Sequence, residues 1–280
     1  MKLGIHLSTF TTSWEEDVLR YVKIASDIGY EGVEIPLVDP FEFQVKKAKK
    51  LLKENNLMCT CGTGLNPAID ISSVDKEVRI KGLEHLKKCI DICNELESDC
   101  LGGVLYAPWG MKKSRIEAVE SIKYSIENLQ KAAVYAKDKG VTLALEILNR
   151  YESYFLNTVK EGNKIIDEIG CENVKLHFDT FHSHIEENNL HEAIIEGGKN
   201  IYHVHFCENT RGVPGTGQID WKSVISALRK IEYTRWITLE NFVVPNCEVG
   251  KDVCIWREIE KDRYTAVKEG FEFMRKLTSE

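Results

Sequence analysis

The chain of 280 residues is 43% hydrophobic and 29% charged, which excludes disordered and fibrous proteins and provides enough apolar residues for a substantial core. Lys and Arg number 37 against 44 Asp and Glu, and the net charge of -7 argues against nucleic acid or an anionic membrane as a partner. No apolar run approaches the roughly 20 residues of a spanning helix, and the start MKLGIHLSTF does not resemble a signal peptide, so we expect a cytoplasmic protein. Nine cysteines without a CxxC pair predict reduced thiols.

Short apolar runs alternate with longer amphipathic segments along the whole chain, and no linker separates them. The runs rich in Val, Ile or Leu predict eight strands, at residues 2–7, 32–35, 57–62, 100–105, 141–146, 174–179, 201–206 and 236–240. The amphipathic segments predict eight helices, at residues 14–28, 41–54, 78–96, 116–139, 159–169, 190–196, 221–230 and 259–276. Eight strand-then-helix units, without a GxGxxG motif after the first strand, predict an α/β protein with one (β/α)8 TIM barrel domain over residues 1–280.

Four successive strands in the second half of the chain end in side chains that can bind a metal. VTLALE ends at Glu146, VKLHFD at Asp179 and WITLE at Glu240, and IYHVHF carries His205. In a closed barrel these strand ends meet at the mouth, where three unpaired carboxylates would repel one another. A divalent cation removes this repulsion, and the oxygen-rich set of ligands favours Mn²⁺ or Mg²⁺, with Co²⁺ also suitable.

Two further histidines share strand faces with these residues. His203 has the same orientation as His205 by the two-residue period of a strand and is an alternative ligand, but His205 lies nearer the C-terminal rim and is preferred. His177 shares a face with Asp179 and lies one layer deeper. For His177 and His203 we expect interior side chains with satisfied hydrogen bonds.

Motifs along essentially the whole chain resemble the D-tagatose 3-epimerase family, which includes the D-psicose 3-epimerases. They follow in matching order: GIHLSTFTTSW (4–14), LGGVLYAPW (101–109), LEILNRYESYFLNTVKEG (145–162), FDTFHSHIEE (178–187), HVHFCENTRGVPGTG (203–217), TLENF (238–242) and IWRE (255–258). The resemblance implies a xylose isomerase-like barrel, one divalent cation per subunit, usually Mn²⁺, and a homodimer or homotetramer. The implied reaction is the reversible inversion of C3 in a free ketose.

The resemblance also implies roles for individual residues. The metal ligands would be Glu146, Asp179, His205 and Glu240, in agreement with the positions of the strand ends. The sugar would be held by Glu152, His182 and Arg211, between aromatic walls at Trp14 and Trp109. Core packing is the alternative for both tryptophans, and a surface salt bridge is the alternative for Arg211.

The first strand departs from the family pattern. GIHLSTF places His6, Leu7 and Phe10 where aromatic residues usually help to line the sugar pocket, so His6 is a further candidate substrate contact. This departure leaves open whether the ketose is of the D-tagatose, D-fructose or L-ribulose type.

The chemistry of this inversion explains the pair of glutamates. A proton must leave the carbon beside the ketone, the charge must be held as an enediolate, and a proton must return on the opposite face. A metal ion would stabilise that enediolate, while Glu146 and Glu240 exchange the protons from different sides of the barrel mouth. The expected protein is therefore a metal-dependent ketose 3-epimerase.

Four other functions are alternatives for a barrel of this kind, and one of them is an inosose dehydratase with the same metal arrangement. An aldose-ketose isomerase would need the same residue types and differs in which C–H bond lies between the two bases. A zinc-dependent abasic-site endonuclease would need more strand-end histidines and a basic surface. A non-catalytic sugar-binding barrel is expected to lose one glutamate of the pair, and both are present here.

Overall fold

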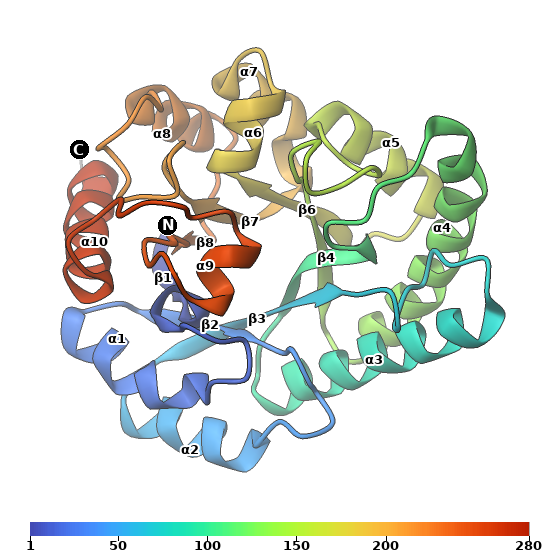
Figure 1. Cartoon of the computed structure of the whole chain (residues 1–280), viewed down its shortest axis with the longest axis horizontal. Helices are drawn as coiled ribbons and strands as arrows, with labels where there is room; N and C mark the ends of the chain where they lie inside the picture. Colours follow the sequence, from blue (N-terminus) through green and yellow to red (C-terminus); the bar gives the residue numbers. More distant parts are fainter. Residues whose placement is uncertain (280) are drawn as a thin grey trace.

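The computed structural model describes residues 1–279 and contains a closed barrel of eight parallel strands surrounded by helices (Figure 1). The strands are β1 (Lys2–His6), β2 (Gly32–Pro36), β3 (Met58–Leu65), β4 (Cys100–Pro108), β5 (Thr142–Glu146), β6 (Val174–Asp179), β7 (Ile201–Phe206) and β8 (Trp236–Leu239). Each strand pairs with the next, and β1 pairs with β8 to close the barrel. The predicted fold is confirmed, and the largest differences in strand bounds are the longer ends of β3 and β4.

Helices lie on the outside of the barrel, between the strands and after the last one. They are α1 (Val22–Ile28), α2 (Val45–Glu54), α3 (Lys76–Glu95), α4 (Arg115–Asp138), α5 (Val159–Ile169), α7 (Leu190–Gly197), α8 (Trp221–Lys230) and α10 (Arg263–Ser279). The sequence did not predict the short helices α6 (Thr180–Glu186) and α9 (Glu248–Asp252). The remaining helical turns are the 3-10 segments η1 (Leu7–Phe10), η2 (Val18–Tyr21) and η3 (Gly198–Asn200).

Capping side chains explain why two predicted helices begin later than expected. The helix predicted from Trp14 starts as the 3-10 turn η2, where the Asp17 carboxylate accepts a hydrogen bond from the Leu19 backbone N–H. The helix predicted from Ile259 starts after Asp262, whose carboxylate accepts from two backbone N–H groups of the first turn. Because the prediction used amphipathic spacing alone, it placed the start of both helices too early in the sequence.

Burial explains why the strands were recognisable from the sequence. Every residue of β4 and β8 is buried, because the inner face packs in the barrel and the outer face packs against the helices. Gly103 in β4 has φ 110°, and a Cβ atom there would lie 2.3 Å from the Thr63 carbonyl oxygen. Only glycine fits this bend of β4 against β3.

The segment between β8 and α10 crosses the mouth of the barrel. α9 projects over the middle of the barrel in the view of Figure 1. The Trp14 indole N–H donates to Asp252 over 2.9 Å, and Ser13 donates to Glu248, so this segment is tied to the loop that follows β1. None of the helices in residues 1–279 combines the length and apolar character needed to span a bilayer.

Candidate metal centre and sugar cavity

The structure brings four predicted residues together at the C-terminal mouth of the barrel. Glu146 ends β5, Asp179 ends β6, His205 lies on β7, and Glu240 directly follows β8. One potential ligand atom from each side chain lies within 4.8 Å of the other three. All four side chains are buried, so these charges face one another with little water between them.

Two atoms of this cluster have no hydrogen-bond partner in residues 1–279. Asp179 uses Oδ1 to cap α6, accepting from the backbone N–H groups of Phe181 at 2.7 Å and His182 at 3.0 Å, and its Oδ2 is unpartnered. His205 Nδ1 is also unpartnered and lies 3.8 Å from Asp179 Oδ2 and 3.5 Å from Glu240 Oε1. Buried polar atoms normally find partners, and a divalent cation would satisfy both. The cluster therefore fits a divalent metal site.

The two glutamates of the cluster differ in electrostatic environment. Burial, followed by the negative charge of Glu240, raises the pKa of Glu146 well above its ordinary value. Burial also opposes ionisation of Glu240, but His205, His6 and Arg211 outweigh it and hold the pKa of Glu240 well below its ordinary value. Carboxyl groups whose pKa values are pushed apart in this way are typical of acid–base pairs.

Arg211 connects Glu240 to the polar side of the cavity. Its Nη1 donates to Glu240 Oε2 over 3.0 Å, and its Nη2 lies 3.2 Å from His182 Nε2. The guanidinium also lies over the Phe181 ring, 3.9 Å from the ring centroid. Arg211 is 5% exposed, so the alternative interpretation as a surface salt bridge is wrong.

Arg211 is held in place by a loop that Glu208 organises. The backbone of Arg211 has φ 64°, a left-handed conformation that is uncommon for a side chain of this size. Glu208 is fully buried, and its carboxylate accepts from the backbone N–H groups of Gly215 and Ile219 and from the Trp221 indole N–H. The sequence showed no role for Glu208, because two of its donors lie in a loop without a periodic pattern and the third is the first residue of α8.

Asn149 orients two of the predicted sugar contacts. Its backbone and side-chain N–H groups lie 3.2 Å and 2.8 Å from His182 Nδ1, and its side-chain amide donates to Glu152 Oε1 over 2.8 Å. His182 Nε2 lies 3.9 Å from Glu146 Oε1 and faces Arg211 Nη2, which can only donate a hydrogen bond. Asn149 was not predicted as a site residue, although it belongs to the LNR motif noted in the sequence.

The aromatic residues lie where a sugar wall is expected. Trp14 and Trp109 meet edge to face with ring centroids 6.2 Å apart, and the Trp109 indole donates to Glu152 over 2.9 Å. His6 lies with its Nδ1 4.0 Å from Glu240 Oε1. Leu7 and Phe10 are fully buried in the core, so of the three departures in the first strand only His6 reaches the cavity.

These residues enclose one cavity of about 370 Å³. Nine of the ten predicted site residues line it, and the tenth, Asp179, lies behind the wall with no exposed surface. Its other walls are largely apolar and include residues that the sequence did not single out: Leu37, Val38, Leu65, Leu148 and Phe242. Apolar walls with a few polar groups fit a small polyhydroxylated ligand.

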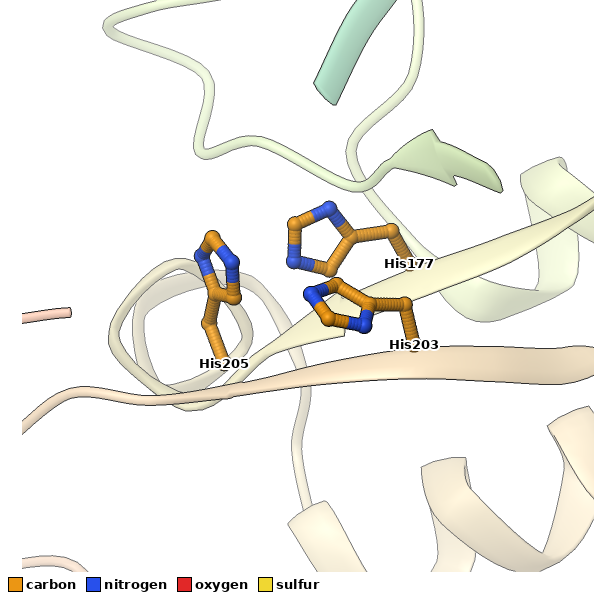
Figure 2. Close-up of side chains that lie close together, drawn as sticks. All are labelled: His177, His203 and His205. Carbon is orange, nitrogen blue, oxygen red and sulfur yellow. The ribbon is translucent and has the colours of Figure 1, made fainter. Parts of the chain in front are cut away.

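His177 and His203 lie next to His205, the histidine of the metal cluster. Figure 2 shows His177 on β6 facing His203 and His205 on β7. Their nitrogens are close enough to resemble a second metal group, but Nε2 of His203 and Nε2 of His205 already donate to Oε2 of Glu34, over 2.6 Å and 3.0 Å. Neither ring nitrogen of His177 has a hydrogen-bond partner in residues 1–279, so the expectation of a satisfied side chain is wrong for that residue. His203 is satisfied only at Nε2, because its Nδ1 has no partner among these residues either.

Known proteins that are similar to this chain in sequence and structure include ketose 3-epimerases. The family described as xylose isomerase-like TIM barrel matches residues 22–277. An L-ribulose 3-epimerase from Methylomonas sp. (strain DH-1) is 34% identical over 98% of this chain and 97% of its own length. A D-psicose 3-epimerase from Agrobacterium fabrum is 30% identical over 92% of this chain and 91% of its own. The crystal structure of a Methylomonas sp. D-allulose 3-epimerase in complex with D-allulose superimposes with a TM-score of 0.92, at 33% identity over 99% and 96% of the two chains.

Proposed function

Because the chain belongs to the xylose isomerase-like TIM barrel family, we propose that it is a metal-dependent ketose 3-epimerase that interconverts free ketoses differing at C3. The observation that carries this function is the pair of buried glutamates, Glu146 and Glu240, at the end of one cavity and around one cation-binding cluster. The similar proteins named as ketose 3-epimerases, over nearly the whole chain, support the same reaction.

The residues that would hold the cation are Glu146, Asp179, His205 and Glu240, and we propose Mn²⁺ as the physiological ion, one per subunit. Three carboxylates and one imidazole form a mostly hard ligand set that suits Mn²⁺ and excludes a structural zinc site. When bound, the cation supplies Lewis-acid stabilisation of the negative charge that develops on the sugar.

The two glutamates move the protons. With C3 of the ketose between them, one carboxylate removes the C3 proton while the electron pair shifts toward the C2 carbonyl, forming an enediolate. The other glutamate then delivers a proton to the opposite face of C3, which inverts that carbon. In the metal-free protein the pKa of Glu146 is raised and that of Glu240 is lowered, so the two carboxylates differ in basicity.

Polar residues around the pair orient the sugar. Arg211 offers planar N–H donors to sugar oxygens and holds Glu240, and His182 lies with its Nε2 beside Glu146. Glu152 is held between Asn149 and the Trp109 indole and offers acceptor capacity to hydroxyl groups. His6 and the two tryptophans complete the walls. We expect these contacts to place C3, rather than C1, between the glutamates.

A panel of ketoses assayed after chelation, with and without added Mn²⁺, tests this function. D-Fructose, D-tagatose and L-ribulose should each be tried, because the apolar walls and His6 determine which sugar is preferred. We expect C3 epimers as products only when metal is restored. Exclusive formation of aldoses would instead indicate an aldose-ketose isomerase, and turnover by the fully metal-free protein would contradict the proposed site.

We also propose that the protein forms a homodimer or homotetramer. This expectation rests on the family, whose members resemble the chain over nearly its whole length. Light scattering at working concentration measures it directly. A mass of 32.0 kDa, that of one chain, would contradict it.

A further inference from the structure

We propose that Glu34 is a positioning residue of the metal centre, which holds His205 so that Nδ1 faces the cation. This inference rests on the proposed function, because it concerns a ligand of the proposed metal site. Glu34 lies in the middle of β2, on the side of the barrel opposite β6. It is not among the site residues predicted from the sequence.

The geometry places both imidazoles of β7 on one carboxylate oxygen. His203 Nε2 and His205 Nε2 lie 2.6 Å and 3.0 Å from Glu34 Oε2. An ionised carboxylate can only accept hydrogen bonds, so each Nε2 must carry a proton. In neutral His205 this leaves a lone pair on Nδ1, the atom that has no hydrogen-bond partner in residues 1–279 and lies 3.5 Å from Glu240 Oε1.

Glu34 lines the cavity, and its Oε2 also lies 3.5 Å from the Thr60 hydroxyl. The side chain is 1% exposed, and its only ion-pair partners in residues 1–279 are the two histidines. A buried carboxylate without a Lys or Arg partner costs free energy unless its hydrogen bonds compensate. A histidine that binds a metal through one nitrogen and donates to a carboxylate through the other is a recurrent arrangement, because the carboxylate fixes the tautomer and increases the basicity of the ligand.

Two glycines provide the space for this carboxylate. A Cβ atom at Gly62 would lie 2.8 Å from Glu34 Oε1, and one at Gly102 would lie 3.8 Å from Oε1 and 3.3 Å from His177 Nδ1. Neither glycine has a left-handed φ, so backbone strain does not explain their presence. A side chain added at Gly62 would therefore displace the Glu34 carboxylate without removing its charge.

The test measures Mn²⁺ affinity in wild type and Glu34→Gln, by the EPR signal of free Mn²⁺. The amide oxygen of Gln keeps an acceptor but removes the negative charge, and we expect the dissociation constant to rise about 10- to 100-fold. The visible absorption of the Co²⁺-loaded variant should change as well, because the His205 ligand is held less firmly. If Glu34 only stabilises the fold, Glu34→Gln would instead have a lower thermal midpoint, with unchanged Mn²⁺ affinity and an unchanged Co²⁺ spectrum.

Glu16→Gln is the matched control. Glu16 is also a hydrogen-bonded carboxylate, accepting from Thr12 N and Oγ1 at 2.8 Å and 2.6 Å and from the Tyr21 hydroxyl at 2.7 Å, but it does not contact the metal cluster. This variant should lose stability and bind Mn²⁺ within about twofold of wild type. A loss of affinity equal to that of Glu34→Gln would show that the effect is nonspecific and would overturn the inference.

Gly62→Ala provides a second, independent variant if Glu34→Gln does not fold. The added methyl group displaces the Glu34 carboxylate, and we expect weaker Mn²⁺ binding with the carboxylate still present. Wild-type affinity in both variants, or in Gly62→Ala alone when the other is unfolded, would refute the role of Glu34. Failure of the wild-type protein to bind Mn²⁺ would refute the proposed metal site itself, so the two outcomes are distinguishable.

Discussion

Replacing Glu146 by Gln is expected to change stability and turnover in opposite directions. Without metal, burial and the charge of Glu240 raise the pKa of Glu146 well above its ordinary 4.5. An acid whose pKa is higher in the folded than in the unfolded state opposes folding at any pH above the unfolded pKa. Gln does not titrate, so this opposition disappears in the variant.

The size of the effect has an upper limit. At pH 7 the solution lies about 2.5 pH units above the ordinary pKa, and each unit corresponds to about 1.36 kcal/mol, so the metal-free variant gains at most about 3 kcal/mol. For a chain of this size each kcal/mol raises the melting temperature by roughly 2–4 °C. The gain should shrink as the pH falls from 7 toward 4.5, where the unfolded wild-type side chain also binds a proton.

Turnover should fall by at least the roughly 10²- to 10⁴-fold typical of a general acid or base, because Gln neither takes nor gives a proton. Glu240→Gln should show a similar loss of turnover, and the double variant should be little worse than either single one, since inversion stops when either base is lost. The assays are thermal unfolding in EDTA from pH 4.5 to 7 and epimerisation with measured metal content. A metal-replete variant with near-normal C3 epimerisation, or a metal-free Glu146→Gln protein less stable than wild type at pH 7, would refute this reasoning.

Three further predictions concern the metal, the arginine and a carboxylate outside the site. Chelation should abolish activity and lower the melting temperature together, and Mn²⁺ or Co²⁺ should restore both. A ligand at 100 times its dissociation constant stabilises the folded protein by about 2.7 kcal/mol. Unchanged activity after exhaustive chelation would contradict this prediction. Arg211→Lys should lower kcat/KM about 10- to 100-fold, since one ammonium cannot replace both guanidinium contacts, and steady-state kinetics showing wild-type kcat/KM would argue against that role. Partial burial raises the pKa of Glu16, but hydrogen bonds from Thr12 and Tyr21 lower it overall to about 2, so Glu16→Gln should cost about 1–2 kcal/mol above pH 4.5. Urea unfolding should show that difference fading between pH 4.5 and 2, and a pH-independent difference would exclude the hydrogen-bonded carboxylate as its source.

The barrel could be predicted from the sequence because its strands are buried on both faces. A parallel barrel strand appears as a short, nearly continuous apolar run, and the eight runs lie at the observed strands. Helix starts depend instead on single capping side chains, which is why Asp17 shortens the first predicted helix. The helix α6 was not predicted, because it has seven residues and its cap, Asp179, had been interpreted only as a metal ligand.

The candidate site could be predicted where its residues follow strand ends, since the topology brings those positions together. Residues that act through other side chains gave no such signal. Glu34 meets His203 across 169 positions of the chain, and only the closed barrel places them in contact. Its visible sign was a charged residue within the apolar run GVEIP, which is also compatible with an exposed strand face. Glu208 was missed because its partners lie along an irregular loop and at the start of α8, and Asn149 because it acts through His182 and Glu152.

The most direct test of two-glutamate epimerisation follows deuterium into the product. The metal-loaded enzyme is given the ketose that it turns over best in deuterated water, and product and recovered substrate are analysed by NMR at low conversion. We predict deuterium at C3 of the product, none at C1, and little at C3 of the recovered substrate, because different glutamates serve the two faces. Exclusive aldose formation, or a C3 epimer that retains its original proton, would contradict the mechanism.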